Sequence, residues 1–465
     1  MASATAAFHG DPIAPVILGV TSILAFAVIG RVGARKLGQP TVLGELLMGI
    51  LLGNIAWYFG FDLIAVLREG PRVFEVVNGV LAGGNMNEVA ISIFGADKGP
   101  ELTEIMTGPQ GGRVMQVAHA VDVFSRYGVI FLLFMVGLET DLDEMKRVGV
   151  ESIRVALLGV AAPVLFGFAA VILMRPDMPL NATLFIAATL GATSIGITAH
   201  VLKEMGRSQS REGRIVLGAA VGDDVLGLIL LAVVSGFVVS GSLDMSQLVT
   251  VVIVSTLFLV AAVMLGPATV RVLAKVMRRL DIVEAKMFTS YLFVMVLAWM
   301  ANLAGLATII GAFAAGTVLH DGYFKEHSGA DDERVVTIRE LIMPLEVILV
   351  PIFFILMGVQ VKIESFLSWP VVTLAAALIA AAFVGKLVSG LGAGPLSDKW
   401  VIGVGMLPRG EVGLVFAAIG RTLGVFDDAI FGAIVAMVFV TTLAAPPLLK
   451  IAINRQLQNT ANGQN

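Results

Sequence analysis

The sequence predicts an all-α polytopic membrane protein with about 13 transmembrane helices, inverted-topology repeats and two discontinuous crossing helices. The first observation behind this prediction is the composition: of 465 residues, 57% are hydrophobic and 14% are charged. Mean hydropathy is +0.92. Ordinary soluble domains contain roughly 25% charged residues, so the composition excludes that class. The sequence contains no cysteine, which excludes disulfides and thiol chemistry.

The second observation is a series of apolar runs, each near the roughly 20-residue length of a membrane-spanning helix. Charged or Pro/Gly-rich breaks separate them, and the break after the eighth run is only a tight turn, NLAGLAT. The predicted spans lie near residues 12–34, 41–60, 122–138, 150–174, 180–202, 213–240, 247–266, 285–304, 305–320, 338–361, 370–393, 400–421 and 428–450.

Basic residues gather in alternate loops between these spans, for example at Arg35, Arg147, Arg207 and Arg278. Loops rich in Lys and Arg face the cytoplasm. The N-terminus is therefore predicted to lie outside and the C-terminus in the cytoplasm. The same pattern places the long segment 61–121 outside, where it is expected to be partly helical.

The third observation is an internal repeat. The second span contains TVLGELLMGILL (41–52) and the ninth contains TIIGAFAAGTVL (308–319), with Thr, Gly, Gly and Leu in identical spacing. The third span contains IFLLFMVGLE (130–139) and the tenth PIFFILMGVQ (351–360). Both matches are displaced by seven spans, so the two copies cross the membrane in opposite senses. Inverted repeats of this kind are typical of secondary transporters.

This repeat predicts the division of the chain into four segments. They are a first inverted repeat at 12–240 containing the 61–121 insertion, a linker helix and cytoplasmic loop at 241–284, a second inverted repeat at 285–452, and a short cytoplasmic tail at 453–465.

Two adjacent aspartates, Asp223 and Asp224, stand inside Arg214–Asp244, a segment whose interior otherwise carries no charge. Burying two like charges in hydrocarbon is costly, so such a pair predicts a functional site. A membrane transporter for cations or protons is the class that it favours.

Two other spans carry signs of an interrupted helix. GATSIGITAH (191–200) clusters Gly, Thr and Ser around Thr193 and Ser194, and MLPRGEVG (406–413) places a proline beside Arg409 and Glu411. Proline removes a backbone donor from a helix. The alternative interpretations are helix packing by small residues for Thr193 and Ser194, and a simple kink at the proline.

The unusual residues share one predicted depth. At about 1.5 Å per residue, Asp223, Thr193, Arg409 and Lys386 each lie roughly 14–18 Å along the helix from the nearest cytoplasmic charge. This is about half of a 30 Å hydrocarbon core. A structural ion-pair cluster is the alternative, but convergence on two interrupted helices favours an ion site.

Carboxylates, hydroxyls and freed carbonyls are hard oxygen ligands suited to a small cation. Asp223 and Asp224 are therefore predicted to hold Na⁺ or protons in competition, which is sufficient for exchange. Lys386 can pair with one aspartate and release a proton when a cation takes its partner. Two protons per Na⁺ would make transport electrogenic.

These motifs, together with LGAAVGDDVLGLI, GKLVSG and GVGMLPRGEVGLVFAAIG, resemble bacterial sodium/proton antiporters of the NapA type. That group belongs to the second monovalent cation:proton antiporter family, with NhaA a more distant relative. The resemblance implies a homodimer in the bacterial cytoplasmic (inner) membrane. It implies that Asp224 is the ion- and proton-carrying aspartate, that Asp223 is its partner paired with Lys386, and that Thr193, Ser194 and Glu411 belong to the site.

The resulting function is exchange of Na⁺ or Li⁺ for H⁺, with a K⁺/H⁺ antiporter as the alternative. A channel fits less well, because a like-charge pair with an opposing lysine suggests stoichiometric exchange. A retinal-based pump fits less well, because of the thirteen spans, the inverted repeat and the 7% of aromatic residues. No enzyme motif, cofactor or nucleic-acid partner is expected, and membrane lipid is the surrounding partner. His200 is expected to be an interfacial histidine, with pH sensing as the alternative.

Overall fold

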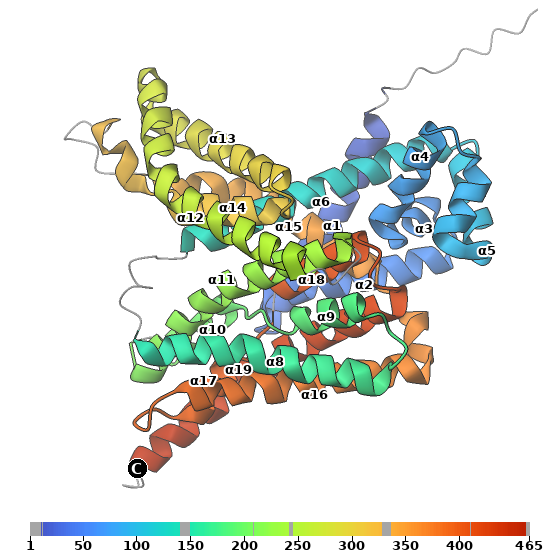
Figure 1. Cartoon of the computed structure of the whole chain (residues 1–465). Helices are drawn as coiled ribbons and strands as arrows, with labels where there is room; N and C mark the ends of the chain where they lie inside the picture. Colours follow the sequence, from blue (N-terminus) through green and yellow to red (C-terminus); the bar gives the residue numbers. More distant parts are fainter. Residues whose placement is uncertain are drawn as a thin grey trace, which may run out of the picture. The chain divides into compact units, whose positions relative to one another are not determined.

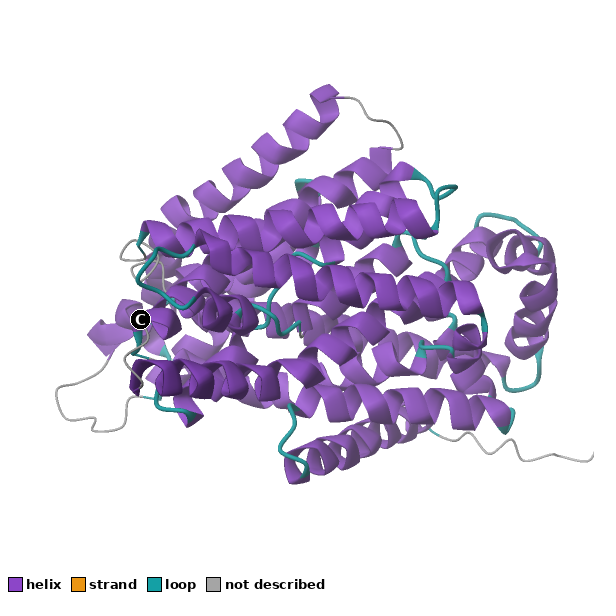
Figure 2. Ribbon diagram, turned by 90° about the horizontal axis from the view of Figure 1, so that it is seen from below, coloured by secondary structure: helices purple, strands orange, loops and turns teal. Residues whose placement is uncertain are grey.

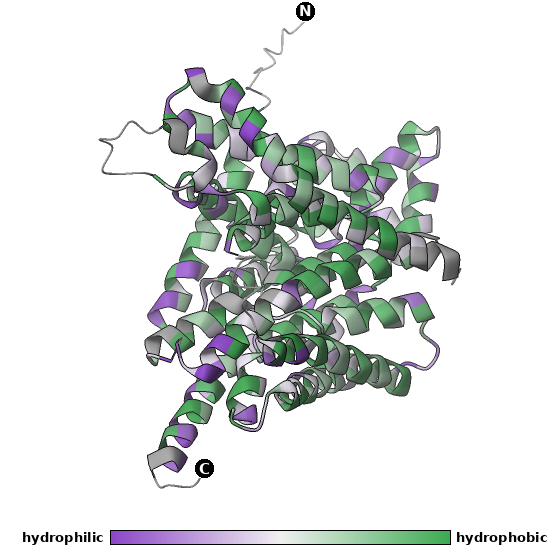
Figure 3. Ribbon diagram, turned by 60° about the vertical axis from the view of Figure 1, so that its left-hand side comes forward, coloured by the Kyte–Doolittle hydropathy of each residue, from purple (hydrophilic) through white to green (hydrophobic). Residues whose placement is uncertain are grey.

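In a computed structural model, the regular elements of the described residues are all helices (Figures 1 and 2). The described residues are 11, 13–139, 149–207, 209–240, 245–327, 336–409 and 411–461. Within them, 10 helices are long and apolar enough to cross a membrane. Figure 3 shows that hydrophobic residues dominate these helices and that hydrophilic residues gather near many helix ends. The protein is therefore an integral membrane protein, as predicted.

Each long helix overlaps one of the predicted spans over most of its length. Their bounds are α1 Ala14–Lys36, α2 Thr41–Tyr58, α6 Gly111–Glu139, α8 Val150–Met174, α11 Arg211–Ser240, α12 Met245–Val276, α13 Ile282–Leu303, α15 Ile338–Val359, α16 Trp369–Ser389 and α19 Asp428–Ala461. Because α19 runs on to Ala461, residues 453–461 of the predicted tail continue the last helix. The linker predicted at 241–284 contains the whole of α12, and the boundaries of the two repeats stay a prediction.

The three other predicted spans are shorter or broken. The ninth contains only α14, Thr308–Val318. The fifth is divided into α9, Leu180–Thr189, and α10, Ile195–Glu204. The twelfth is divided into α17, Lys399–Gly405, and α18, Glu411–Thr422. The prediction of two discontinuous helices is confirmed, whereas helix length alone does not establish the count of thirteen spans.

The predicted insertion 61–121 is largely helical. It contains α3, Asp62–Arg68, and α4, Val73–Leu81, followed by α5, Met86–Thr107. Asn85 begins α5 by accepting hydrogen bonds from the main-chain N–H groups of the next turn, as an N-cap residue does. The 3₁₀ helices of the chain are η1 Gly70–Arg72, η2 Met277–Arg279, η3 Asp321–His327, η4 Ile363–Leu367 and η5 Gly390–Gly392.

The chain forms two compact units. Unit 1 comprises Met1–Gly128 and Ile348–Lys362, and unit 2 comprises Val129–Val347 and Ile363–Asn465. The helices α6 and α15 contribute residues to both units. All the predicted site residues belong to unit 2.

In unit 1 the inserted helices are fastened to the ends of α2 and α15 by polar contacts. Lys362 pairs with Glu69 at 2.5 Å. Arg68 donates to the Asn54 side chain at 3.0 Å, and Asn54 donates in turn to the Val361 carbonyl at 2.9 Å. These bonds hold the insertion in place at both helix ends.

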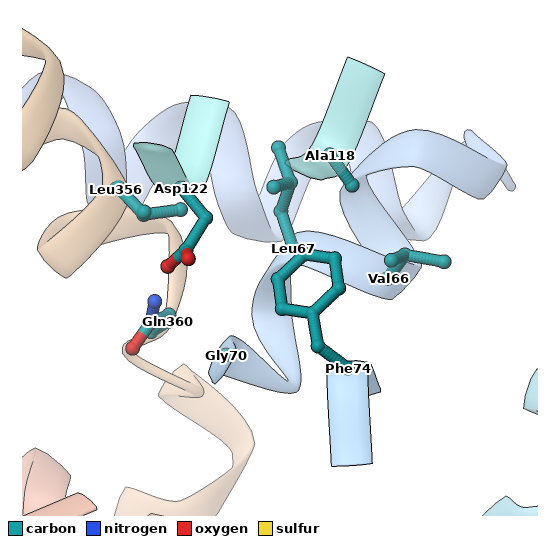
Figure 4. Close-up of a pocket in the computed structure, with 8 residues that line it drawn as sticks. All are labelled: Val66, Leu67, Gly70, Phe74, Ala118, Asp122, Leu356 and Gln360. Atoms are coloured by element: carbon teal, nitrogen blue, oxygen red, sulfur yellow. The ribbon is translucent and has the colours of Figure 1, made fainter. Parts of the chain in front are cut away.

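A small cavity of about 10 Å³ lies among the inserted helices, α6 and α15. In Figure 4 the side chains of Asp122 and Gln360 point toward one another across it. The remaining lining is mostly apolar and includes Leu67, Phe74 and Leu356. Its volume is sufficient for about one water molecule.

Glycines bring four pairs of helices into backbone contact, and the contacts occur at equivalent positions of the two repeats. A Cβ atom on Gly44 of α2 would lie 2.1 Å from the Gly30 carbonyl oxygen of α1. The equivalent Gly311 of α14 would place a Cβ atom 2.1 Å from the Leu297 carbonyl oxygen of α13. The first two helices of each repeat therefore cross in the same way.

In the second pair of contacts, a helix of one repeat packs against a helix of the other repeat. Gly49 of α2 packs against Gly358 of α15, where a Cβ atom on Gly49 would lie 3.0 Å from the Gly358 Cα. Gly316 of α14 packs against Gly137 of α6 in the same manner. A Cβ atom on Gly137 would lie 3.0 Å from the Gly316 Cα. The third helix of each repeat thus packs on the second helix of the other repeat.

Substitution of Gly316 by Ala should lower the melting temperature of the detergent-purified protein. The added methyl would meet the Phe134 carbonyl oxygen at 2.2 Å, and overpacking of this kind costs about 1–3 kcal/mol. Gly33→Ala in α1 is the matched control, because a Cβ there has no neighbour within 4 Å. A Gly316→Ala protein as stable as the control would contradict the tight crossing.

Candidate functional site

The candidate site lies in a bundle formed by α8–α11 and α16–α19, here called the site bundle. Its helices contact one another within unit 2, and α8, α9, α16, α17 and α19 lie side by side in Figure 1. The non-helical stretches between α9 and α10 and between α17 and α18 meet inside this bundle. An apolar environment offers no water to the carbonyl groups that such breaks release, so the protein must satisfy them.

The first interrupted helix supplies donors to the second. The Ser194 main-chain N–H donates to the Pro408 carbonyl at 2.8 Å. The Thr198 hydroxyl donates to the Gly405 carbonyl at 2.7 Å, and the Thr193 hydroxyl to the Met406 carbonyl at 3.4 Å. Thr193 and Ser194 are each 2% exposed. Their predicted place at the broken helix is therefore the place that the structure gives them.

Arg409 makes the reciprocal contact from the second interrupted helix. Its guanidinium donates to the carbonyls of Leu190 and Ala192, just beyond the end of α9. Thr442 of α19 donates to the Arg409 carbonyl. The carbonyl end of a helix carries partial negative charge, so a cation is stabilised there. Arg409 lies at this end of α9 and is buried, with 1% of its surface exposed.

Lys386 of α16 completes the set. Its ammonium donates to the Gly191 carbonyl at 2.6 Å and lies 3.2 Å from both carboxylate oxygens of Asp223. Both side chains are fully buried. The predicted pair of Asp223 with Lys386 is thus present, and the lysine is shared between the carboxylate and the broken helix.

Asp224 follows Asp223 on α11 and is 5% exposed. Successive residues of an α-helix point about 100° apart, so the two carboxylates leave the helix in different directions. Asp223 faces the Lys386 ammonium, and Asp224 is the second acid of the same buried turn. Gly159 of α8 lies close to this carboxylate: a Cβ on it would be 3.6 Å from Asp223 Oδ1, an ordinary van der Waals contact.

Two predicted residues cannot be placed in the same detail. Glu411 is the first residue of α18 and His200 belongs to α10, but their side chains lie outside the described part of the structure. Their predicted roles stay predictions.

Sequence reasoning missed Thr198, Thr442 and the carbonyl of Gly191. Thr198 follows Ser194 by one helical turn in the same glycine-rich stretch, which was the available signal. Thr442 belongs to a Thr-Thr pair in the apolar part of α19. Every residue carries a main-chain carbonyl, so residue identity does not show which carbonyl a side chain contacts. The Gly191 contact could therefore not be predicted.

The described side chains of the site carry balanced charge when all are ionised. Lys386 and Arg409 supply two positive charges, and Asp223 and Asp224 supply two negative ones. An additional cation would leave an unbalanced charge in an apolar interior, which is costly. Entry of a cation therefore favours departure of a proton from the same group. Crossed, interrupted helices around a buried group of charges are the arrangement found in secondary transporters.

The chain belongs to the sodium/hydrogen exchanger family. The family pattern described as "Sodium/hydrogen exchanger, transmembrane" matches residues 22–454. Members of this family are secondary transporters and not enzymes.

Individual relatives extend over nearly the whole chain. The high-affinity Na⁺/H⁺ antiporter NhaS3 of Synechocystis sp. is 35% identical over 460 residues, covering 96% of this chain and 93% of that protein. The Na⁺/H⁺-K⁺ antiporter GerN of Bacillus cereus is 31% identical over 440 residues, covering 92% and 93%. The solved structure of the sodium proton antiporter MjNhaP1 from Methanocaldococcus jannaschii has the same fold. Its TM-score is 0.60 at 15% identity, over 95% of this chain and 99% of that one.

Replacing Thr198 by Val should destabilise the crossing of the interrupted helices. The change keeps the shape but removes the donor to the Gly405 carbonyl, and an unsatisfied buried group costs about 1–3 kcal/mol. Thr441→Val is the matched control, because the equally buried Thr441 hydroxyl donates only to carbonyls of its own helix. Thermal unfolding in detergent should separate the two variants. Equal melting temperatures would contradict a special role for the Thr198 bond.

Proposed function

We propose that this protein exchanges Na⁺ or Li⁺ for protons across the membrane, with Asp224 and Asp223 as the cation- and proton-binding residues. The observation that carries the proposal is the buried, charge-balanced group of two acids and two bases beside freed main-chain oxygens. Because the ionised group is already balanced, an added cation leaves excess charge unless protons depart, so Na⁺ and protons compete for the site. The names of the relatives, including NhaS3, agree with this chemistry.

Each residue has a proposed role. Asp224 carries the cation in one direction and a proton in the other. Asp223 holds Lys386 when no metal cation is bound. Thr193, Ser194 and the carbonyls of the breaks supply neutral oxygens, which suit an alkali cation. Arg409 satisfies carbonyls just beyond the end of α9, and Glu411 is proposed to add charge at the second break.

The lysine gives the proposal its stoichiometry. When Na⁺ takes Asp223 from Lys386, the ammonium loses its counter-charge inside an apolar bundle and releases a proton. A second proton leaves Asp224, which in this cycle is protonated before Na⁺ binds. Two protons for one Na⁺ move one net charge per cycle, so 100 mV of membrane potential contributes about 2.3 kcal/mol. Alternating access follows from movement of the helices that carry the site.

The setting is proposed from the sequence and the relatives. The protein is placed in the bacterial cytoplasmic membrane, with the N-terminus outside, the C-terminus in the cytoplasm and a homodimer as the working assembly. K⁺/H⁺ exchange is the second candidate, because the printed name of GerN includes K⁺.

Purified protein in liposomes should move protons when Na⁺ or Li⁺ is added under a clamped potential, and K⁺ should act only at higher concentration. The half-saturating Na⁺ concentration should rise as the pH falls, because protons occupy the same oxygens. Asp224→Asn should abolish the flux. Asp122→Asn, which alters another buried aspartate outside the site, should retain it. Flux in the Asp224→Asn protein would refute the carrier, and stronger flux with K⁺ would select the second candidate.

Lys386→Gln should make any remaining exchange insensitive to voltage, because the second proton of the cycle is lost. Lys286→Gln is the matched control, because this lysine is also buried, at 1% exposed, and pairs with Asp321 at 2.7 Å outside the site. Both variants should be less stable, but only Lys386→Gln should change the response to a valinomycin-imposed potential. The same voltage dependence in both variants would reduce Lys386 to a structural counter-charge.

A further inference from the structure

A closed set of polar contacts lies at the end of the site bundle where α8 and α11 begin. The Arg211 Nε donates to the Ser397 hydroxyl at 2.9 Å, and a terminal nitrogen of Arg211 lies 2.7 Å from Glu151 Oε1. The Ser397 hydroxyl donates to the other Glu151 oxygen at 3.3 Å. These three residues, here called the clamp, join the first turns of α8 and α11 to the loop between η5 and α17.

A neighbouring contact strengthens the same connection. The Asp398 main-chain N–H donates to Glu212 Oε1 at 3.3 Å, and Glu212 is 6% exposed. Asp398 is also the N-cap residue of α17, accepting from the N–H groups of Trp400 and Val401. The start of the second interrupted helix is therefore attached to the first turn of α11, the helix that carries both site aspartates.

Close backbone packing connects the clamp to the lysine. A Cβ on Gly394 would lie 2.4 Å from Glu151 Oε1, and one on Gly392 would lie 2.8 Å from the Val155 nitrogen. Nearer the lysine, a Cβ on Gly385 would lie 2.5 Å from the Pro163 Cα. The chain from Gly385 to Gly394 thus packs closely on α8 at these three glycines, and close-packed interiors transmit strain.

We infer that Glu151 and Arg211 are positioning residues, which hold the loop between η5 and α17 and thereby keep Lys386 against Asp223 and the Gly191 carbonyl. The inference rests on the proposed function, because it treats the Lys386 ammonium as the competitor of Na⁺ at Asp223. Neither residue touches the transported ions. Both act through the position of α16.

This arrangement has a definite consequence for binding. When the clamp is broken, the loop gains freedom and the lysine is held less firmly at Asp223. The ammonium then competes less well, so Na⁺ binds more tightly. A purely structural role would instead lower the amount of folded protein without changing the half-saturating concentration.

Glu151→Gln should lower the half-saturating Na⁺ concentration by about threefold in the liposome assay, the size of effect available to a partly exposed ion pair. The maximal rate should change less. Reversal of the pair in Glu151→Arg/Arg211→Glu should restore the wild-type value. Asp428→Asn is the matched control, because it breaks the Arg421–Asp428 pair of the same bundle. The exposed fraction of the carboxylate is 27% there and 26% at Glu151.

A second measurement is independent of transport. The chain contains no cysteine, so nitroxide labels react only at cysteines that are introduced. We choose Leu396→Cys and Arg214→Cys, two exposed positions on the loop and on α11. Adding Glu151→Gln should broaden the distance distribution between the labels. An unchanged distribution, or an unchanged or raised half-saturating concentration, would overturn the inference. Failure of the wild-type protein to exchange Na⁺ would overturn the proposed function alone, since the label distances still test the clamp.

Discussion

The satisfaction of main-chain carbonyls at the two helix breaks is the constraint on which the rest of the site depends. Hydrocarbon provides no donors, so every carbonyl released by an interruption must be paired within the protein. Leu190 and Ala192 are paired by Arg409, and Gly191 is paired by Lys386. Two cations are thereby drawn into the centre of an apolar bundle. Their presence makes buried acids necessary, and Asp223 and Asp224 supply them.

This constraint explains why a costly group of charges is stable where it stands. A buried ion pair alone is weak support for a fold, because desolvation offsets most of the attraction. Here the bases also satisfy carbonyls that would otherwise be unpaired, and the partial charge at the end of α9 favours them. The same contacts that close the helix breaks set the charge balance that a transported cation must respect. The stability of the helix breaks and the proposed transport therefore both depend on the contacts of Lys386 and Arg409 with main-chain carbonyls.

Much of this site could be predicted from local sequence features. A charge inside an apolar run is conspicuous, which identified Asp223, Asp224, Lys386 and Arg409. Clustered Gly, Ser, Thr and Pro identified both breaks. Contacts between distant segments left no local signal: Thr198 with Gly405, Thr442 with Arg409, and the clamp each join residues that meet only through tertiary packing. The fold was predictable for the same reason, through the apolar runs and the repeat. The polar contacts that fasten the inserted helices to the ends of α2 and α15 were not predictable.

The packing of helices of one repeat against helices of the other has a consequence for biosynthesis. Gly49 packs against Gly358, a residue that follows it by about 300 positions in the chain. At about 5–20 residues per second, α2 leaves the ribosome roughly 15–60 s before its packing partner exists. During that interval the side of α2 that carries Gly49 lacks its native neighbour α15, although Gly44 can already pack against α1. Neither half of the chain can complete its own packing alone, so the first half must be kept from wrong associations in the membrane until the second half has been inserted.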